Sequence, residues 1–223
     1  MKSIVESIRK KLDKNFTYKN VQVTVKDPLP NSIKIKKVID KVFKKVPSHL
    51  LSNLDVIYVG KFKELEDRSL QAMYKNSAIF ITNEQSSVDD MLDDLIHEIA
   101  HSIEEQYESI IYGDLKLEKE FINKRKQLWD SLRSDGYDVS LEDFLETKFN
   151  NSLDQFLYAE IGYPVLSLYS SNLFYSPYGC TSLREYFANG FEAFFMREEV
   201  HRLKKISPML YTKLVELLQL EKS

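Results

Sequence analysis

Residues 97–101 read His-Glu-Ile-Ala-His, which is the pattern H-E-x-x-H. Within a helix, two histidines four residues apart project from one face on successive turns, so both imidazoles can reach one zinc ion at about 2.0–2.1 Å. The glutamate beside the first histidine lies next to the water on such a metal rather than on the metal itself. The residue types and their spacing therefore predict a zinc site with His97 and His101 as ligands and Glu98 as general base.

Coincidence is a poor explanation for this motif. The chain contains only 4 His and is expected to show the pattern by chance on the order of 0.006 times, given its composition. The alternative is that His97 and His101 are ordinary helix residues that bond to their neighbours. The two remaining histidines, His49 and His201, are expected to be surface residues.

A helix over residues 87–111 must position the motif. Leu92, Ile96, Ile99 and Ile103 recur at helical spacing and predict the buried stripe of this helix. Its start is marked by Ser87, which has an acid three residues later and further acids in the first two turns, as in a helix N-terminus with complementary charge. The stretch 84–114 holds ten acids and no Lys or Arg, and capping accounts for most of that acidity.

The remaining pattern predicts an α+β fold that is mostly helical, with a small mixed sheet packed on the helix of the motif. Alternating or β-branched runs predict three short strands, at residues 21–25, 54–59 and 77–82. Helical spacing, punctuated by Gly, Pro and Asn, predicts helices at 3–14, 31–46, 115–134, 141–149, 151–160, 182–200 and 207–220. We expect one domain over residues 1–223, with an α/β lobe at 1–82 and a helical lobe with the metal site at 83–223.

A catalytic zinc needs a third protein ligand and one open position. The metzincin extension is excluded, because it requires Gly at 104 and His at 107 where this chain has Glu104 and Tyr107. A carboxylate from a second helix remains. Glu185 and Glu192 lie two turns apart on one face of an aromatic-rich helix, so from spacing alone either could be the ligand.

Residues 178–188 read Tyr-Gly-Cys-Thr-Ser-Leu-Arg-Glu-Tyr-Phe-Ala. Together with the H-E-x-x-H motif, this segment resembles the lethal-factor-like zinc endopeptidases, a gluzincin group that includes the Pro-Pro endopeptidases of clostridia. The likeness covers roughly residues 85–105 and 176–220. The resemblance implies a zincin-like fold, one Zn²⁺ held by His97, His101 and Glu185, Glu98 as general base, and Tyr178 as the residue that supports the oxyanion.

Two departures from that family concern the second helix. The family usually has an acid four residues after the ligand glutamate, whereas this chain has Asn189, whose carbonyl oxygen could accept a hydrogen bond from a ligand histidine without adding charge. In addition, His101 and Glu185 lie 84 positions apart, which predicts that 115–170 is an inserted helical region that roofs the cleft or binds a partner.

The resemblance also implies the reaction, which is hydrolysis of a peptide bond in a protein or peptide substrate bound in extended form. Residues 77–82, just before the helix of the motif, are expected to be the edge strand against which the substrate pairs, the alternative being an internal strand. Residues 150–180 are rich in aromatics, which predicts either core packing or the wall of a substrate pocket: Phe156, Tyr158, Tyr163, Tyr169, Phe174, Tyr175 and Tyr178.

Composition limits the partners. The net charge of -3 and the pI near 5.9 give no overall attraction to nucleic acid or to an anionic membrane, so we expect no nucleic-acid binding. No stretch of the sequence approaches the roughly 18 apolar residues of a membrane span, so we expect no such span. The N-terminal region departs from this overall balance, because residues 1–46 carry thirteen Lys or Arg against four acids. These cationic side chains are either a solvated surface or a docking surface for an acidic partner or for the protein's own acidic flank. The oligomeric state is left open.

The location and the biological role are less constrained. The single cysteine, Cys180, excludes an intrachain disulfide, is expected to be a buried small side chain, and fits a reducing compartment. No signal peptide is evident, so we expect a cytoplasmic location by default. This can be the cytoplasm of the producing cell or that of a cell into which the protein is delivered as a toxin. Non-classical export is a further option. Two alternatives stay open: a non-catalytic interaction or regulatory protein stabilised by a metal, and a regulator protease that cleaves a repressor.

Overall fold

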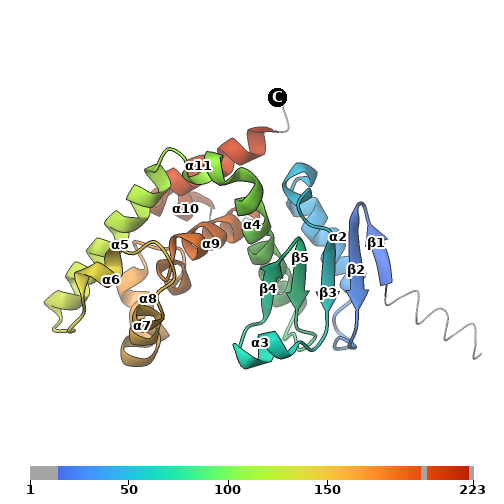
Figure 1. Cartoon of the computed structure of the whole chain (residues 1–223), viewed down its shortest axis with the longest axis horizontal. Helices are drawn as coiled ribbons and strands as arrows, with labels where there is room; N and C mark the ends of the chain where they lie inside the picture. The colour runs from blue at the N-terminus through green and yellow to red at the C-terminus, as the bar shows by residue number, and fades with distance from the viewer. Residues whose placement is uncertain (1–14, 197–199, 221–223) are drawn as a thin grey trace, which may run out of the picture. The chain divides into compact units, whose positions relative to one another are not determined.

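The chain forms two compact units, Met1–Gln106 and Tyr107–Ser223, of which the computed structural model describes residues 15–196 and 200–220 (Figure 1). The first unit contains a mixed sheet with helices, and the second is helical, so the predicted α+β class is confirmed. The boundary lies after residue 106 and not after residue 82 as predicted. The physical reason is that the first part of the long motif helix is anchored to the sheet by side-chain hydrogen bonds described below.

The sheet has five strands in the order β1-β2-β3-β5-β4. Their bounds are β1 Asn15–Tyr18, β2 Val21–Val25, β3 Val56–Val59, β4 Ala72–Lys75 and β5 Ala78–Ile81. The three predicted strands are confirmed and form the parallel centre β2-β3-β5, whereas the unpredicted β1 and β4 are antiparallel edge strands. The expectation that 77–82 is an edge strand is therefore wrong, because β5 pairs with β3 on one side and with β4 on the other.

One face of the sheet is the core of the first unit. Across the strands Ile57 of β3 lies between Val23 of β2 and Ile79 of β5, and all three side chains have no solvent exposure. The neighbouring positions Thr24, Tyr58 and Phe80 point to the opposite face and are half-buried. The sheet thus has one covered face and one open face.

Within residues 15–106, the helical segments of the first unit are α2 Ile35–Lys45, η1 Ser48–Leu51, α3 Lys63–Asp67 and the start of α4 Val88–Tyr112. Helix α2 is held to β1 by a hydrogen bond from Tyr18 Oη to Asp40 Oδ1, 2.8 Å. One lysine of α2 reaches the acidic flank, because Lys41 Nζ lies 3.3 Å from Asp89 Oδ1. Other lysines of this helix, such as Lys37, are solvent-exposed. The helix predicted at 3–14 lies outside the described residues.

Helix α4 has the predicted start and the predicted buried stripe. The backbone N–H of Asp90 donates to Ser87 Oγ at 3.0 Å, so Ser87 caps the helix. The stripe that contains Ile96 and Ile99 is at most 1% exposed. The helix has non-helical backbone angles at Tyr107 (φ -118°, ψ 22°), which is the first residue of the second unit.

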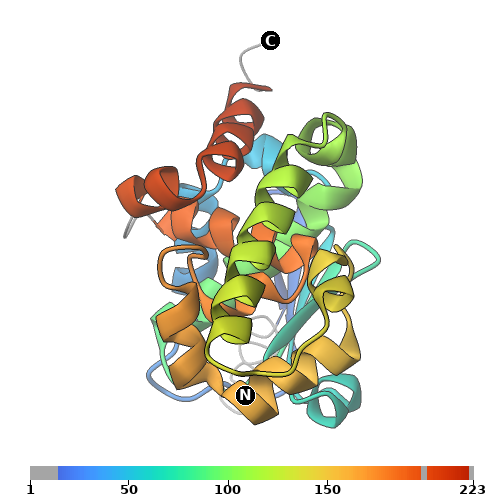
Figure 2. The same ribbon diagram turned by 90° about the vertical axis from the view of Figure 1, so that its left-hand side faces the viewer.

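The second unit is built from helices. In chain order they are α5 Lys116–Ser134, α6 Leu141–Leu145, α7 Asn151–Gln155, the π-helix η2 Phe156–Ile161, α8 Tyr163–Ser170, η3 Pro177–Cys180, α9 Leu183–Met196, α10 Val200–Ile206 and α11 Pro208–Gln219. Helix α8 was not predicted, because Pro164 reads as a break but stands in the first turn, where proline is tolerated. The region 115–170 is part of the unit, since α5 contacts α8, α9 and α11 (Figure 2).

Helix α5 fixes the junction between α10 and α11. The Glu120 carboxylate accepts hydrogen bonds from the backbone N–H groups of Met209 (2.9 Å) and Leu210 (3.1 Å), and from the buried Tyr186 hydroxyl (2.8 Å). One turn later, the buried Lys124 ammonium donates to the carbonyl of Ile206, the last residue of α10. Glu120 therefore caps the N-terminus of α11 and ties it to α9, the helix that carries the predicted third ligand.

We expect Glu120→Ala to destabilise the second unit by about 2–4 kcal/mol, because three donors lose a charged acceptor. Trp129, the single tryptophan, lies in α5 and reports on this unit, so its fluorescence in a urea titration gives the change. Glu118→Ala in the same helix is the matched control, with an expected cost below about 1 kcal/mol. Equal unfolding midpoints for the two variants would contradict the assigned role of Glu120.

Candidate metal centre

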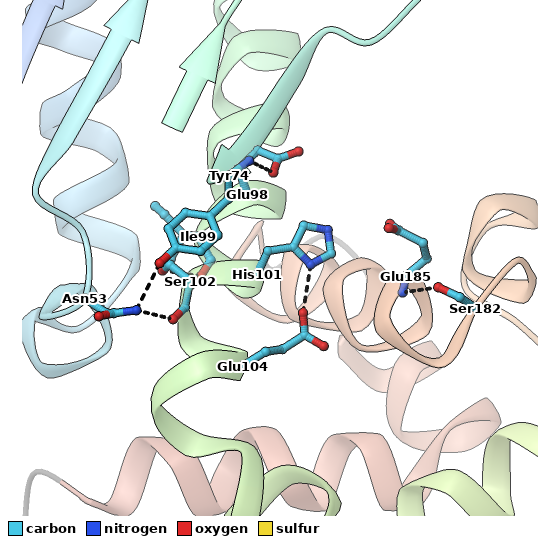
Figure 3. Close-up of polar contacts among 9 residues, drawn as sticks. All are labelled: Asn53, Tyr74, Glu98, Ile99, His101, Ser102, Glu104, Ser182 and Glu185. Atoms are coloured by element: carbon cyan, nitrogen blue, oxygen red, sulfur yellow. Dashed lines mark hydrogen bonds and ion pairs between the residues drawn. The ribbon is translucent and has the colours of Figure 1, made fainter. Parts of the chain in front are cut away.

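The structure brings three potential ligand groups together on α4. The ligand atoms of His97, Glu98 and His101 lie within 4.8 Å of one another. Glu98 and His101 are drawn in Figure 3. The two imidazole rings are 5.0 Å apart between centroids and nearly perpendicular. His101 and Glu98 are buried, whereas His97 is half-buried. This group could hold a metal ion, and it combines the donors that zinc prefers.

The orientation of His101 supports that assignment. Its Nδ1 lies 2.8 Å from Glu104 Oε2, one turn further along α4. A carboxylate on Nδ1 holds the proton there and leaves Nε2 as the lone-pair donor, which is the usual arrangement behind a metal-bound histidine. The residues present therefore fit a zinc ion. Sequence reasoning used Glu104 only to exclude the metzincin pattern and missed this role, although the spacing of three residues from His101 was a visible signal.

We expect Glu104→Gln to lower zinc affinity by about 10–100-fold. A neutral amide holds the His101 imidazole less firmly than a carboxylate does, and it does not raise the basicity of the ring nitrogen that would bind the metal. Competition with a fluorescent zinc chelator measures the change. Glu108→Gln, an exposed acid one turn further on, is the control and should leave the affinity unaltered. An unchanged affinity in Glu104→Gln would show that the Glu104 carboxylate does not support the site.

Glu98 is held from the sheet rather than from its own helix. The backbone N–H of Tyr74 in β4 donates to Glu98 Oε2 at 2.6 Å. The Tyr74 hydroxyl in turn donates to Glu105 Oε2 at 2.9 Å, and the Asn53 side-chain amide donates to the same carboxylate oxygen at 3.0 Å and to the Ser102 carbonyl at 3.2 Å. These bonds hold both the edge strand β4 and Asn53 against the face of α4 that carries Glu98 (Figure 3).

The Tyr74 hydroxyl is suited to act as a donor in this network. Burial, and then the hydrogen bond to Glu105, raise the pKa of Tyr74 above its ordinary value. The phenol therefore stays protonated at neutral pH and can donate the hydrogen bond to Glu105. Sequence reasoning missed both residues, because Tyr74 lies in an edge strand that the pattern did not reveal.

Two predicted site residues belong to the second unit. Glu185 is half-buried in the first turn of α9, where its backbone N–H donates to Ser182 Oγ at 3.1 Å. Tyr178 is half-buried in η3, and its carbonyl accepts a hydrogen bond from the Thr181 hydroxyl at 2.9 Å. Glu192, the alternative to Glu185, is also half-buried in α9. The group of donors that the structure assembles thus comprises His97, Glu98 and His101, and the other two assignments remain predictions.

Asn189 of α9 lies next to the segment that carries Tyr178. Its carbonyl oxygen accepts a hydrogen bond from Ser176 Oγ and lies against Gly179, so Asn189 supports the η3 segment. A hydrogen bond from a ligand histidine to Asn189 stays a prediction. Cys180 is fully buried, which confirms the prediction of a buried small side chain, and burial raises the pKa of its thiol to about 12.

The aromatic residues of segment 150–180 differ in their burial. Phe174 has no exposure and packs its ring against Phe121 and Tyr186, which is core packing. Tyr158 and Tyr163 form a ring pair 5.8 Å apart at the surface, with exposures of 66% and 36%. These two rings remain candidates for a substrate wall.

Comparison with known proteins adds no relatives: no protein-family model matches the chain, and no curated protein and no solved structure is significantly similar to it. Within the described ranges, none of the helices combines the length and the apolar composition of a transmembrane span.

Proposed function

We propose that this protein is a zinc-dependent endopeptidase with a zincin-like fold and the site of the lethal-factor-like group. The observation that carries the proposal is the grouping of His97, Glu98 and His101, with Glu98 tied to an edge strand and His101 backed by a carboxylate. A structural metal site needs neither a general base beside its ligands nor a strand edge next to it. Hydrolysis of an extended peptide needs both.

The proposed ligands are His97, His101 and Glu185. Zinc held by them supplies a Lewis acid that makes water nucleophilic near neutral pH. The protein then contributes position and proton transfer. Glu98 takes the proton from the attacking water and delivers it to the departing amine, and its hydrogen bond from Tyr74 keeps one carboxylate oxygen fixed while the other is available for the proton.

Tyr178 is assigned to the oxyanion that develops on the peptide carbonyl, as its hydroxyl is a neutral donor. We assign the extended substrate to the outer edge of β4, because β4 and not 77–82 is the edge strand. The Gln71 carbonyl accepts a hydrogen bond from the Thr82 N–H at 2.8 Å. In an antiparallel pair the main-chain groups of successive residues point alternately toward and away from the partner strand, so those of Ala72 point away from β5. They can bond to an added strand, whereas the outward N–H of Tyr74 is taken by Glu98.

The proposal is tested by digestion of a peptide library, with the products identified by mass spectrometry. The protein with one equivalent of zinc should cleave a subset of peptides at a recurring position. The chelated protein and a Glu98→Gln variant should leave the library intact. If the zinc-loaded protein cleaves nothing beyond these two controls, the protein is not an endopeptidase, and a metal-stabilised interaction protein becomes the better interpretation.

Tyr178→Phe should lower kcat by about 100-fold with KM and zinc content little changed, because the lost hydrogen bond strengthens only as charge develops on the oxygen. Steady-state kinetics on one cleaved peptide measures this split. Tyr178→Ala is the companion variant, since it also removes the ring. If Tyr178→Phe is fully active while Tyr178→Ala is unstable, the tyrosine only packs in η3.

A further inference from the structure

The open face of the sheet carries a hollow that the endopeptidase proposal does not use. It has a volume of about 600 Å³, and its floor includes the half-buried rings of Tyr58, Phe62 and Phe80. Lysines that include the exposed Lys26 and Lys63 stand at its rim. This lysine-aromatic hollow lies on the face of the sheet opposite to the buried valine and isoleucine side chains.

The rings of the floor are packed on one another. Tyr58 of β3 and Phe80 of β5 are stacked with centroids 5.2 Å apart, and Phe62 meets Phe80 edge-on at 5.3 Å. The Lys26 ammonium lies 4.7 Å from the centroid of the Phe62 ring and covers its face. Ring faces that are already occupied are poor stacking platforms for nucleobases, but the floor remains an apolar surface for aliphatic side chains.

The charge at the rim is not balanced. Lys61 pairs with Glu84 at 2.6 Å, and Lys75 pairs with Glu64 at 3.2 Å. Lys26 and Lys63 line the same hollow and form no ion pair with an acid within the described part of the chain. Two uncompensated ammonium groups over an apolar floor complement a ligand that combines carboxylates with apolar side chains.

We propose that the lysine-aromatic hollow docks an acidic segment of a partner polypeptide, with apolar side chains on the rings and carboxylates at Lys26 and Lys63. The chain's own residues 1–14 do not fit this charge, because they carry five cationic and two acidic side chains. The hollow shares β4 with the proposed substrate edge through Met73 and Lys75, but its lining includes none of His97, Glu98 and His101, so the docking does not depend on the proposed hydrolysis. In an endopeptidase it would hold a substrate away from the bond that is cleaved.

Fluorescence anisotropy with a short labelled peptide rich in glutamate and leucine tests the proposal on the full chain. The peptide should bind, and the double change Lys26→Glu with Lys63→Glu should weaken binding by about tenfold or more. Lys34→Glu with Lys37→Glu alters the net charge equally at exposed positions next to and on α2, and should change the affinity less than about twofold. Mass spectrometry of the peptide after each titration records any cleavage separately.

Further probes distinguish an acidic peptide from other possible ligands of the hollow. Peptides in which lysine replaces glutamate, or serine replaces leucine, should bind at least about tenfold more weakly, because each lacks one of the two required features. Equal losses in the two double variants, or undiminished binding of the serine peptide, would overturn the proposal. So would tighter binding of oligothymidylate or of a synthetic peptide with the sequence of residues 1–14. If sedimentation shows a dimer of the unmodified chain and a monomer of the Lys26→Glu, Lys63→Glu variant, the hollow binds a second copy of the chain instead.

Discussion

Glu98→Gln should reduce peptide hydrolysis by at least about 1,000-fold and leave the zinc content near one per chain. Glutamine has the same shape and can still accept the hydrogen bond from the Tyr74 backbone N–H, so the side chain keeps its place beside the histidines. It cannot take a proton from water at neutral pH. Chemistry is therefore lost while the ligands and the fold remain.

The measurement combines turnover of a cleaved peptide, elemental analysis for zinc, and a thermal melt. Glu108→Gln, an exposed acid on the same helix, removes the same charge outside the site and should keep full activity. Loss of zinc from Glu98→Gln would mean that Glu98 is a ligand rather than the base. Retained hydrolysis would mean that another group removes the proton.

The fold elements that could be predicted from sequence are those whose burial is periodic. Helix α4 buries Ile96 and Ile99 on one face, and β2 alternates buried and outward positions, so both leave a clear pattern. The edge strands β1 and β4 leave a weak pattern, because an edge strand is covered on one side only. In β4 burial falls steadily from the buried Ala72 through the half-buried Met73 and Tyr74 to the exposed Lys75, without alternation.

The same contrast applies to the site. His97, Glu98 and His101 could be predicted because one helix supplies all three at a fixed spacing. The support of Glu98 could not, because its donor is a backbone N–H, which any residue of the strand except proline provides. That contact also depends on the packing of β4 against α4, which brings together Tyr74 and Glu98, 24 positions apart in the sequence, and has no signature in the local pattern of either element.

The metal ligands give the second large effect. His97→Ala, His101→Ala and Glu185→Ala should each reduce zinc from about one per chain to less than about a tenth after dialysis, because a stable catalytic zinc needs three protein ligands. Glu192→Ala is the matched control for Glu185→Ala, since both acids are half-buried on α9 two turns apart. It should retain zinc and activity.

Comparison of Glu185→Ala with Glu192→Ala identifies the third zinc ligand, which α4 does not supply in the proposed site. If Glu192→Ala loses zinc while Glu185→Ala keeps it, the ligand lies two turns further along α9, and the likeness of residues 178–188 to the lethal-factor-like group has misplaced it. If both variants keep zinc while the histidine variants lose it, the metal is held from α4, where the Glu98 carboxylate already lies with the two imidazoles. Glu98 would then be engaged as a ligand, the base would be missing, and the endopeptidase proposal would fail together with the assignment of Glu185.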